Sequence, residues 1–191
     1  MISLPNRGGL GPLAQIGFVV RDIDAAMEEW MRVADIRSFL CFDQVVNPNT
    51  VHRGQRTNVD ISIAIGYASD DLEIEIISQR NDGPSPYSEF IGSGREGLQH
   101  LAYLVDDCPP AWQKLEEQGL ERVYSVIPEN DGFPITYFDG PNGFGAMVEI
   151  VPGSFRPMRE ARRKFLNAET TAPGVHRFAT MGAFYKQVGL I

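Results

Sequence analysis

Cysteine is scarce in this chain of 191 residues, which contains only Cys41 and Cys108. Two cysteines cannot build the disulfide framework of a small secreted domain, and their wide separation offers no metal-binding spacing. No run approaches the ~20 apolar residues that cross a bilayer. The N-terminal stretch also lacks the charged and apolar regions of a signal peptide. We therefore expect a cytoplasmic protein that does not insert into a membrane.

An excess of positive charge is also missing. The chain has 17 basic and 25 acidic residues, for a net charge of −8, which argues against nucleic acid as a partner. The charge is uneven, because residues 153–191 carry a net charge of +5 and the rest of the chain −13. This basic C-terminal extension predicts docking onto the acidic body, onto a second subunit or onto an anionic ligand.

The chain contains an internal repeat. Residues 15–27 (QIGFVVRDIDAAM) align without gaps with residues 100–112 (HLAYLVDDCPPAW). Each segment is an apolar run of strand length, followed by an acidic turn and a helical pattern. Residues 72–78 and 146–151 match in the same way, so that Glu75 aligns with Glu149. A duplicated pattern of this kind predicts one structural unit built twice.

Between these landmarks each copy has room for two further strands. They are expected at about 39–46 and 57–67 in the first copy, and at about 121–127 and 133–139 in the second. We therefore predict an α+β fold in which the curved sheets of two βαβββ modules form a partly open barrel around a metal site. The expected parts are an N-terminal segment (1–12), the first module (13–78), a linker (79–97), the second module (98–152) and the C-terminal extension (153–191) with a helix at about 156–168.

The C-terminal extension ends in a segment with several large apolar side chains. Residues 170–191 include Phe178, Met181, Phe184 and Tyr185. Exposing so many such side chains to water is unfavourable. We expect this segment to pack against the surface of a partner.

Four polar residues stand at repeat-equivalent positions. Gln15 and His100 begin the first strand of each copy, whereas Glu75 and Glu149 lie in the last strand, each between two large apolar residues. A carboxylate in an apolar strand is costly to bury unless it is paired or bound to a cation. Alternation along the strands allows these side chains to project to the concave side of a curved sheet. One imidazole, two carboxylates and one amide oxygen form a ligand set suited to a divalent transition metal.

Each of these residues also has an ordinary structural explanation. A histidine at a strand start is commonly a core or rim residue, and a strand glutamate commonly faces solvent. The repeat shifts the balance toward a metal site, because it pairs all four positions. Glu73 shares a strand face with Glu75 and is a rival ligand, although the repeat favours Glu75. His52 lacks support from the repeat and is expected at the surface.

With these residues so placed, the chain resembles the vicinal oxygen chelate superfamily (glyoxalase, bleomycin resistance, dioxygenase) over about residues 13–152. Residues 97–107 (GLQHLAYLVDD) are similar to the segment that opens the second module in epimerases and glyoxalases. The residues after Glu75 look most like methylmalonyl-CoA epimerase, and the ligand set looks like that of some glyoxalase I enzymes. The resemblance implies Gln15, Glu75, His100 and Glu149 as ligands of one Ni, Co, Zn, Mn or Fe ion, and a homodimer.

The resemblance also implies a reaction class. A divalent metal acts as Lewis acid on a small carbonyl substrate, such as a CoA thioester, and stabilises an enolate. A carboxylate moves the proton beside the carbonyl; by similarity this base is Glu149, with Glu75 as its partner on the opposite face. The expected activity is that of an isomerase, an epimerase or a glyoxalase-like lyase.

Three positions depart from these relatives. Gln15 stands where dioxygenases and most epimerases have histidine. Val19 and Gln79 stand where some glyoxalases have the arginine and asparagine that bind glutathione. Two alternatives therefore remain open: a resistance-type protein that binds a small molecule without catalysis, and a ring-cleaving dioxygenase with an altered ligand set.

Overall fold

The computed structural model describes residues 9–69, 71–129, 132–140 and 145–191, so residues 1–8 of the predicted N-terminal segment lie outside the described residues. The first half of the fold comprises β1 (Leu13–Val19), α1 (Ile23–Val33), β2 (Ser38–His52), β3 (Gln55–Ser69) and β4 (Leu72–Gln79). The second half comprises β5 (Gly97–Val105), α3 (Cys108–Glu117), β6 (Glu121–Val126), β7 (Ile135–Asp139) and β8 (Met147–Pro152), with α2 (Pro86–Gly92) between the halves. The C-terminal extension contains the short 3₁₀ turn η1 (Gly153–Phe155), α4 (Arg156–Asn167), β9 (Gly174–Phe178) and α5 (Met181–Gln187).

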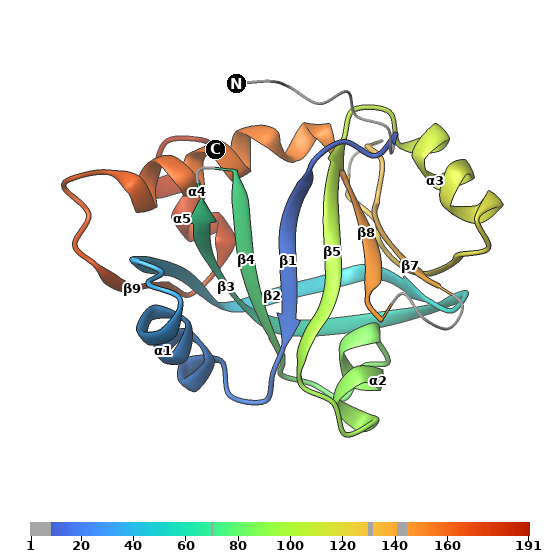
Figure 1. Ribbon diagram of the computed structural model, residues 1–191, viewed down its shortest axis with the longest axis horizontal. Coiled ribbons are helices and arrows are strands. Elements are labelled where there is room, and N and C mark those ends of the chain that lie inside the picture. Colours follow the sequence, from blue (N-terminus) through green and yellow to red (C-terminus); the bar gives the residue numbers. More distant parts are fainter. Residues whose placement is uncertain (1–8, 70, 130–131, 141–144) are drawn as a thin grey trace.

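The strands form one curved sheet in which both halves have the same order. The first half runs β2-β3-β4-β1 and the second runs β6-β7-β8-β5 (Figure 1). The halves join through the antiparallel pairs β1–β5 and β2–β6. The second of these joins only residues 50–52 to residues 124–126. The ring therefore closes over a short stretch of β2, and the prediction of two βαβββ modules in a partly open barrel is confirmed.

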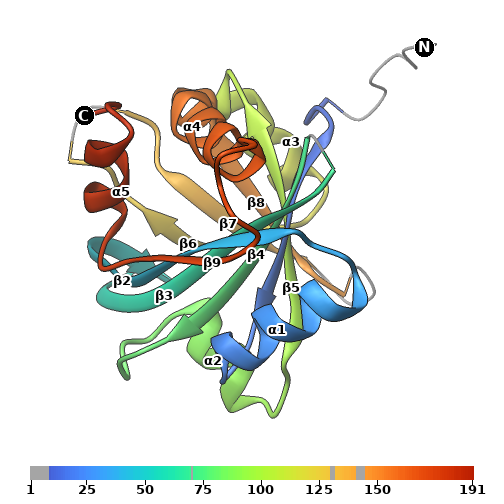
Figure 2. The same ribbon diagram turned by 90° about the vertical axis from the view of Figure 1, so that its left-hand side faces the viewer.

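Strand alternation separates the inside of the barrel from the helices outside it. On β1, Ile16 and Phe18 pack against the cluster that holds α1, while Val19 belongs to the core inside the barrel. On β8, Val148 and Ile150 pack against α3. Figure 2 shows α1 and α2 together at one end of the barrel and α4 and α5 at the other. The inner face of the central strands is thus directed into an enclosed space.

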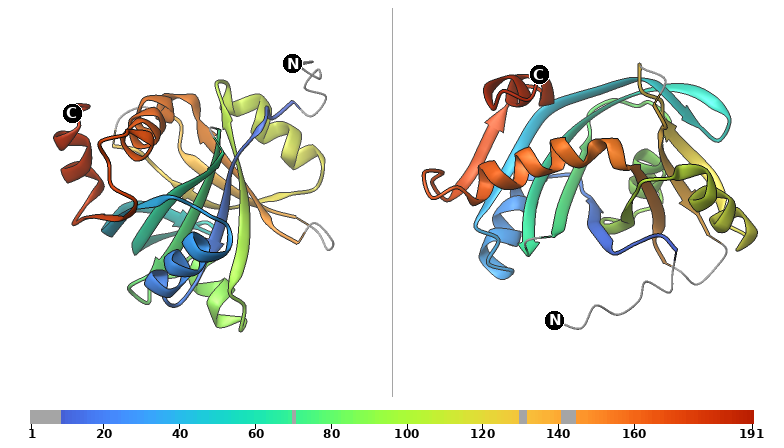
Figure 3. Two further views of the ribbon diagram at one scale, coloured as in Figure 1. Left: turned by 60° about the vertical axis from the view of Figure 1, so that its left-hand side comes forward. Right: turned by 90° about the horizontal axis from the view of Figure 1, so that it is seen from above.

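The C-terminal extension packs on its own barrel. Strand β9 pairs in parallel with residues 38–42 of β2, and α4 crosses between the arch of β2 and β3 and the strands β1 and β8 (Figure 3). Phe184 and Tyr185 are only 0% and 3% exposed and belong to the main core. The prediction that residues 170–191 cover a partner surface is therefore wrong, because β2 and α4 of the same chain bury these side chains.

The surface position predicted for His52 is also wrong. Its side chain is buried, and its ring lies edge-on to that of Tyr124 with centroids 6.1 Å apart. Strand β2 extends as far as His52, and this length places the residue inside the fold rather than at its surface. Among the described residues, no helix combines the length and apolar character that a membrane span requires.

A buried ion pair holds α4 to the barrel. Glu73 on β4 is 2% exposed and accepts hydrogen bonds from the Tyr67 hydroxyl (2.6 Å) and from Arg162 Nη2 (3.0 Å). Arg162 also donates to the Tyr185 hydroxyl on α5 at 2.7 Å. Burial alone would lower the pKa of Arg162, but the charge of Glu73 outweighs it and the pKa is raised. The extension and the sheet are thus joined through paired charges in a dry environment.

Removal of this cation should destabilise the fold strongly. We expect Arg162→Leu to lower the free energy of unfolding by about 3–5 kcal/mol, because the buried Glu73 loses its hydrogen-bonded cation and keeps only Arg159, whose Nη1 lies 3.9 Å from Glu73 Oε2. Arg32→Leu is the matched control, since Arg32 forms an exposed ion pair with Glu29 on α1 and should cost at most about 0.5 kcal/mol. Urea denaturation of both variants measures the difference. Equal effects would contradict the structural role of the buried pair.

Candidate metal centre

The seam between the halves positions the predicted site. Gly17 on β1 lies between Glu75 on β4, its parallel partner, and His100 on β5, its antiparallel partner. Ala102, two residues beyond His100, pairs in parallel with Glu149 on β8. The two glutamates are thus brought to equivalent places on either side of the β1–β5 seam. The sequence repeat thus corresponds to an approximate symmetry of the site.

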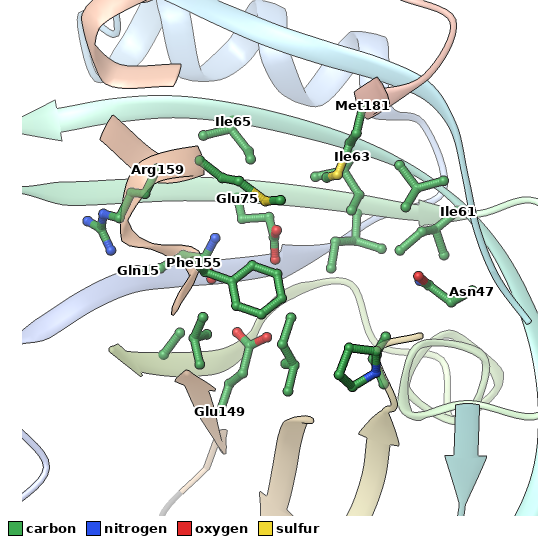
Figure 4. A pocket seen from close by; sticks show the side chains of 18 of the residues that line it. Gln15, Asn47, Ile61, Ile63, Ile65, Glu75, Glu149, Phe155, Arg159 and Met181 are labelled. Atoms are coloured by element: carbon green, nitrogen blue, oxygen red, sulfur yellow. The ribbon is translucent and has the colours of Figure 1, made fainter. Parts of the chain in front are cut away.

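Glu75, His100 and Glu149 form a compact buried cluster. His100 Nε2 lies 3.3 Å from Glu75 Oε2 and 3.3 Å from Glu149 Oε2. One nitrogen or oxygen atom of each residue lies within 4.8 Å of the others. Figure 4 shows the carboxylates of Glu75 and Glu149 pointing toward each other within a cavity, and Gln15 lies close to them in the lining of that cavity. The imidazole and both carboxylates can therefore reach one common point.

A β-bulge orients the histidine. Between Gly17 and Phe18 of β1, the partner strand β5 advances from His100 to Leu98, which leaves Gln99 as an extra residue. Gln99 and His100 are consequently both buried, although they are consecutive in a strand. The Gln99 Oε1 atom lies 2.6 Å from His100 Nδ1, and the Gln99 amide donates to Met147 Sδ at 3.2 Å. Gln99 Oε1 thus accepts a hydrogen bond from Nδ1–H, and in the neutral imidazole the Nε2 lone pair faces the carboxylates.

The same irregularity occurs in the first half. Ala14 is the extra residue of β1 between Leu13 and Gln15, and its place in the repeat is that of Gln99. Gln15 and His100 therefore each follow a bulge, at equivalent places in the two strands. The bulges therefore set the orientation of Gln15 and His100 in the same way.

The electrostatics of the cluster favour a bound cation. Burial raises the pKa of Glu149 to about 7, an effect that the charge of His100 opposes and that of Glu75 reinforces. Burial lowers the pKa of His100, but the two carboxylates outweigh it and the pKa is raised. Both shifts mean that His100 and Glu149 compete for protons. A divalent cation at the same point would satisfy all three without a proton.

Two buried atoms in the cluster have no hydrogen-bond partner among the described residues. They are His100 Nε2 and Glu149 Oε2. Buried polar atoms are nearly always paired, so two orphaned atoms directed at each other call for a missing partner. A nitrogen and two carboxylate oxygens are ligands that divalent transition metals accept. The residues present therefore fit such an ion.

The rival ligand Glu73 lies elsewhere. Its carboxylate accepts hydrogen bonds from Arg162 on α4 and from the Tyr67 hydroxyl on β3. Glu75, two residues further along β4, enters the cluster instead. Gln15 lines the same cavity as the two cluster glutamates. The assignment of Gln15, Glu75, His100 and Glu149 as ligands remains a proposal.

Sequence reasoning missed two tyrosines beside the cluster. The Tyr137 hydroxyl lowers the pKa of the Glu149 carboxyl, against the raising effect of burial, and the Tyr87 hydroxyl donates to that of Tyr137 at 3.0 Å. The ring of Tyr137 also lies edge-on to His100, with centroids 5.2 Å apart. The repeat contained no signal for Tyr137, because the matching position at the Glu75–Glu149 offset is Ile63. Gln99 carried a weak signal, since two consecutive polar residues open an otherwise apolar strand.

The cluster lies in a cavity of about 360 Å³. Its walls come from the long strands β2 and β3, the central strands β1, β4, β5 and β8, the loop after β6, and the C-terminal extension. The residues that line the cavity include Gln15, Glu75, Glu149, Val45, Ile61, Ile63, Ile65, Ile127, Ile135, Phe155, Met158, Arg159, Arg162 and Met181.

Comparison with known families decides the relationship. Residues 14–137 match the sequence profile described as Glyoxalase/Bleomycin resistance protein/Dioxygenase superfamily. The chain belongs to this superfamily. The resemblance to the vicinal oxygen chelate fold is confirmed, and the match ends before the C-terminal extension. Comparison with curated protein sequences gave no significant match.

Solved structures of the superfamily agree on the fold. A hypothetical protein from Bacillus halodurans C-125 aligns with a TM-score of 0.52 and 19% identity, over 73% of this chain and 91% of that one. Methylmalonyl-CoA epimerase from Mycobacterium tuberculosis gives 0.51 and 20%, over 73% and 86%. A variant of the Streptomyces coelicolor methylmalonyl-CoA epimerase, in complex with 2-nitronate-propionyl-CoA, gives 0.51 and 18%, over 75% and 94%. At these identities the similarity establishes the architecture alone.

Proposed function

We propose that this protein is a divalent-metal-dependent isomerase, epimerase or lyase that removes a proton beside a carbonyl group. The observation that carries the proposal is the buried cluster in which His100 Nε2 lies 3.3 Å from both Glu75 and Glu149. Such a cluster is unfavourable without a cation, because two carboxylates repel each other in a medium of low polarity. The family and the fold support the same class of activity.

In this proposal His100, Glu75, Glu149 and Gln15 hold the ion, and Gln99 fixes the ring of His100 through Nδ1. The bound ion would act as a Lewis acid that polarises the substrate carbonyl and makes the neighbouring proton more acidic. Glu149 accepts this proton. The Tyr137 hydroxyl favours the charged form of the Glu149 carboxylate, because it lowers the pKa of that group. Burial excludes water that would otherwise compete for the carboxylate.

The arrangement of the two glutamates bears on the outcome of the reaction. Their carboxylates point toward each other (Figure 4). A substrate carbon between them has a base on each face, so that a proton taken by Glu149 can be replaced from Glu75. This arrangement supports epimerisation, whereas a single active carboxylate would suffice for an isomerase or a lyase.

Metal analysis tests the proposal first. We expect about one Ni, Co, Zn, Mn or Fe ion per chain in the purified or reconstituted protein, and a loss of this ion in His100→Ala, because a neutral imidazole nitrogen is a principal ligand. The matched control is His176→Ala, since His176 lies on β9 outside the cluster, where its ring meets the carbonyl of Ala172 and the ring of Phe165. Inductively coupled plasma mass spectrometry measures the stoichiometry.

The result separates the remaining alternatives. A protein that binds no metal after reconstitution would contradict the proposal and favour a binding protein that sequesters a small molecule. Iron together with oxygen consumption would favour a ring-cleaving dioxygenase with an altered ligand set. The homodimer and the cytoplasmic location also remain predictions, which gel filtration and fractionation of the source cells would test.

A further inference from the structure

Most apolar groups of the cavity lie apart from its buried carboxylates, although Asn47 lies beside Ile61 (Figure 4). Glu75, Glu149 and Gln15 gather at one side, and the branched side chains of Ile61 and Ile63 extend away from them (Figure 4). Further apolar side chains from β2, the β6–β7 region and the extension complete this wall, among them Val45, Ile127, Ile135, Met158 and Met181. A ligand that brings an oxygen to the glutamates therefore places the rest of its body against hydrocarbon.

The described residues offer no free cation to the cavity. Arg159 and Arg162 are the only basic side chains that this part of the chain contributes to the lining. Arg162 is bound to Glu73 and Tyr185. Arg159 donates to the backbone carbonyls of Ala14 and Asp71, both at 2.6 Å, and Figure 4 shows its guanidinium directed away from Glu75 and Glu149.

The remaining charges at the cavity are acidic. Four glutamates of the described chain line it, including the exposed Glu129 beyond β6. Recognition of phosphate groups relies on free arginine or lysine side chains, or on the N-termini of helices. A carrier with several phosphates would therefore find acidic and apolar groups here rather than its usual partners.

The size of the cavity also argues against a large carrier group. A volume of about 360 Å³ lies near the lower end of the range for small-molecule sites. Phe155, Met158 and Met181 close it from the C-terminal extension, which lies outside the residues that match the family profile. The extension thus contributes an apolar wall to the cavity.

The geometry points to a compact ligand: a carbonyl compound with an uncharged, aliphatic or aromatic body and no phosphate-bearing carrier such as coenzyme A. That the ligand has a carbonyl group follows from the proposed function, whereas the apolar character of its body follows from the lining of the cavity. The C-terminal extension then determines specificity, because Phe155, Met158 and Met181 contact the part of the ligand that does not react.

A series of ketones tests the inference. We compare 2-butanone, 2-octanone and propionyl-CoA by ligand-observed NMR titration, with the metal-free and the nickel-loaded protein. Each buried methylene strengthens binding up to about fourfold, so 2-octanone should bind at least about tenfold more tightly than 2-butanone after the costs of ordering the chain. Propionyl-CoA should bind more weakly than 2-octanone.

Two cavity variants and one control locate the binding. Ile63→Phe adds bulk to the wall and Met181→Glu adds a charge, and both should weaken 2-octanone binding by about fivefold or more while changing 2-butanone by less than about twofold. Val33→Phe is the control, because Val33 is exposed on α1, and it should change neither. Met181 is only half-buried, so that its variant reports on the cavity even if Ile63→Phe does not fold.

The outcomes separate this inference from the proposed function. Equal affinities for the two ketones, or tighter binding of propionyl-CoA, would overturn the inference. The inference is supported if the affinity rises from 2-butanone to 2-octanone in Val33→Phe but not in Met181→Glu, with or without nickel. Failure to bind nickel would instead count against the proposed function and leave the ligand class standing.

Discussion

Gly17→Ala is expected to abolish metal binding although residue 17 carries no ligand atom. A β-carbon at this position would lie 1.9 Å from Cε1 and 2.0 Å from Nε2 of the His100 ring. No real contact is that short, so the imidazole must leave its place between Glu75 and Glu149. Loss of one ligand should weaken metal binding by roughly a hundredfold or more, which isothermal titration with NiCl₂ measures.

A double variant shows whether the imidazole is the cause. Gly17→Ala alone should also destabilise the fold by about 1–3 kcal/mol, because the strand interior is overpacked. Adding His100→Ala removes the clashing ring, so the double variant should regain this stability and still fail to bind metal. Gly92→Ala is the control, since no described atom lies within 4 Å of its added β-carbon. Metal binding at the level of the unmodified protein in Gly17→Ala would remove His100 from the ligand set.

The repeat in the sequence was sufficient to predict the fold and the meeting of the three cluster residues. A module that is built twice must bury its open edges against its copy, and this pairs β1 with β5 and β2 with β6. Once these edges meet, residues at equivalent places are related by the approximate symmetry. Glu75 and Glu149 were therefore predictable as a pair, without knowledge of any distance.

Features outside the repeat were less accessible. The partner of Glu73 is Arg162, 89 residues later, and no local pattern links the two. Alternation made Glu73 and Glu75 equal candidates, because both face the inside of the barrel; the structure distinguishes them through a long-range ion pair. The bulges at Ala14 and Gln99 likewise depend on how β1 and β5 slide past each other, a property that neither strand has alone.

The packing of the C-terminal extension shows why apolar content alone misleads. Phe184 required a covering surface, and a partner subunit and the same chain satisfy this requirement equally well at the level of sequence. Strand β9 pairs with a free edge of β2 in the same chain, and this pairing places α5 over the core. Because the β2–β6 contact is short, this edge was free to accept another strand.

Glu149→Gln should separate metal binding from proton transfer. The glutamine amide has nearly the shape of the carboxylate and retains an oxygen that can face a metal ion, but it cannot accept a proton at neutral pH. We expect the metal content to stay near one ion per chain and the rate of proton abstraction to fall by about 10²–10⁴-fold, the contribution of a positioned general base. Exchange of the α-protons of a ketone or thioester substrate with D₂O, followed by NMR, measures this rate.

Two further variants define the roles of the carboxylates. Glu129→Gln, at the exposed part of the cavity lining, is the control and should leave the exchange rate unchanged. Glu75→Gln should block interconversion of two enantiomers if each glutamate serves one face, and yet allow exchange of the proton that Glu149 removes. If Glu149→Gln retains full exchange while Glu75→Gln loses it, the base is Glu75 and the assignment by similarity is reversed. If both variants retain full exchange, neither carboxylate is the base, whereas no exchange above background in the unmodified protein would make the sequestering protein the better description of this site.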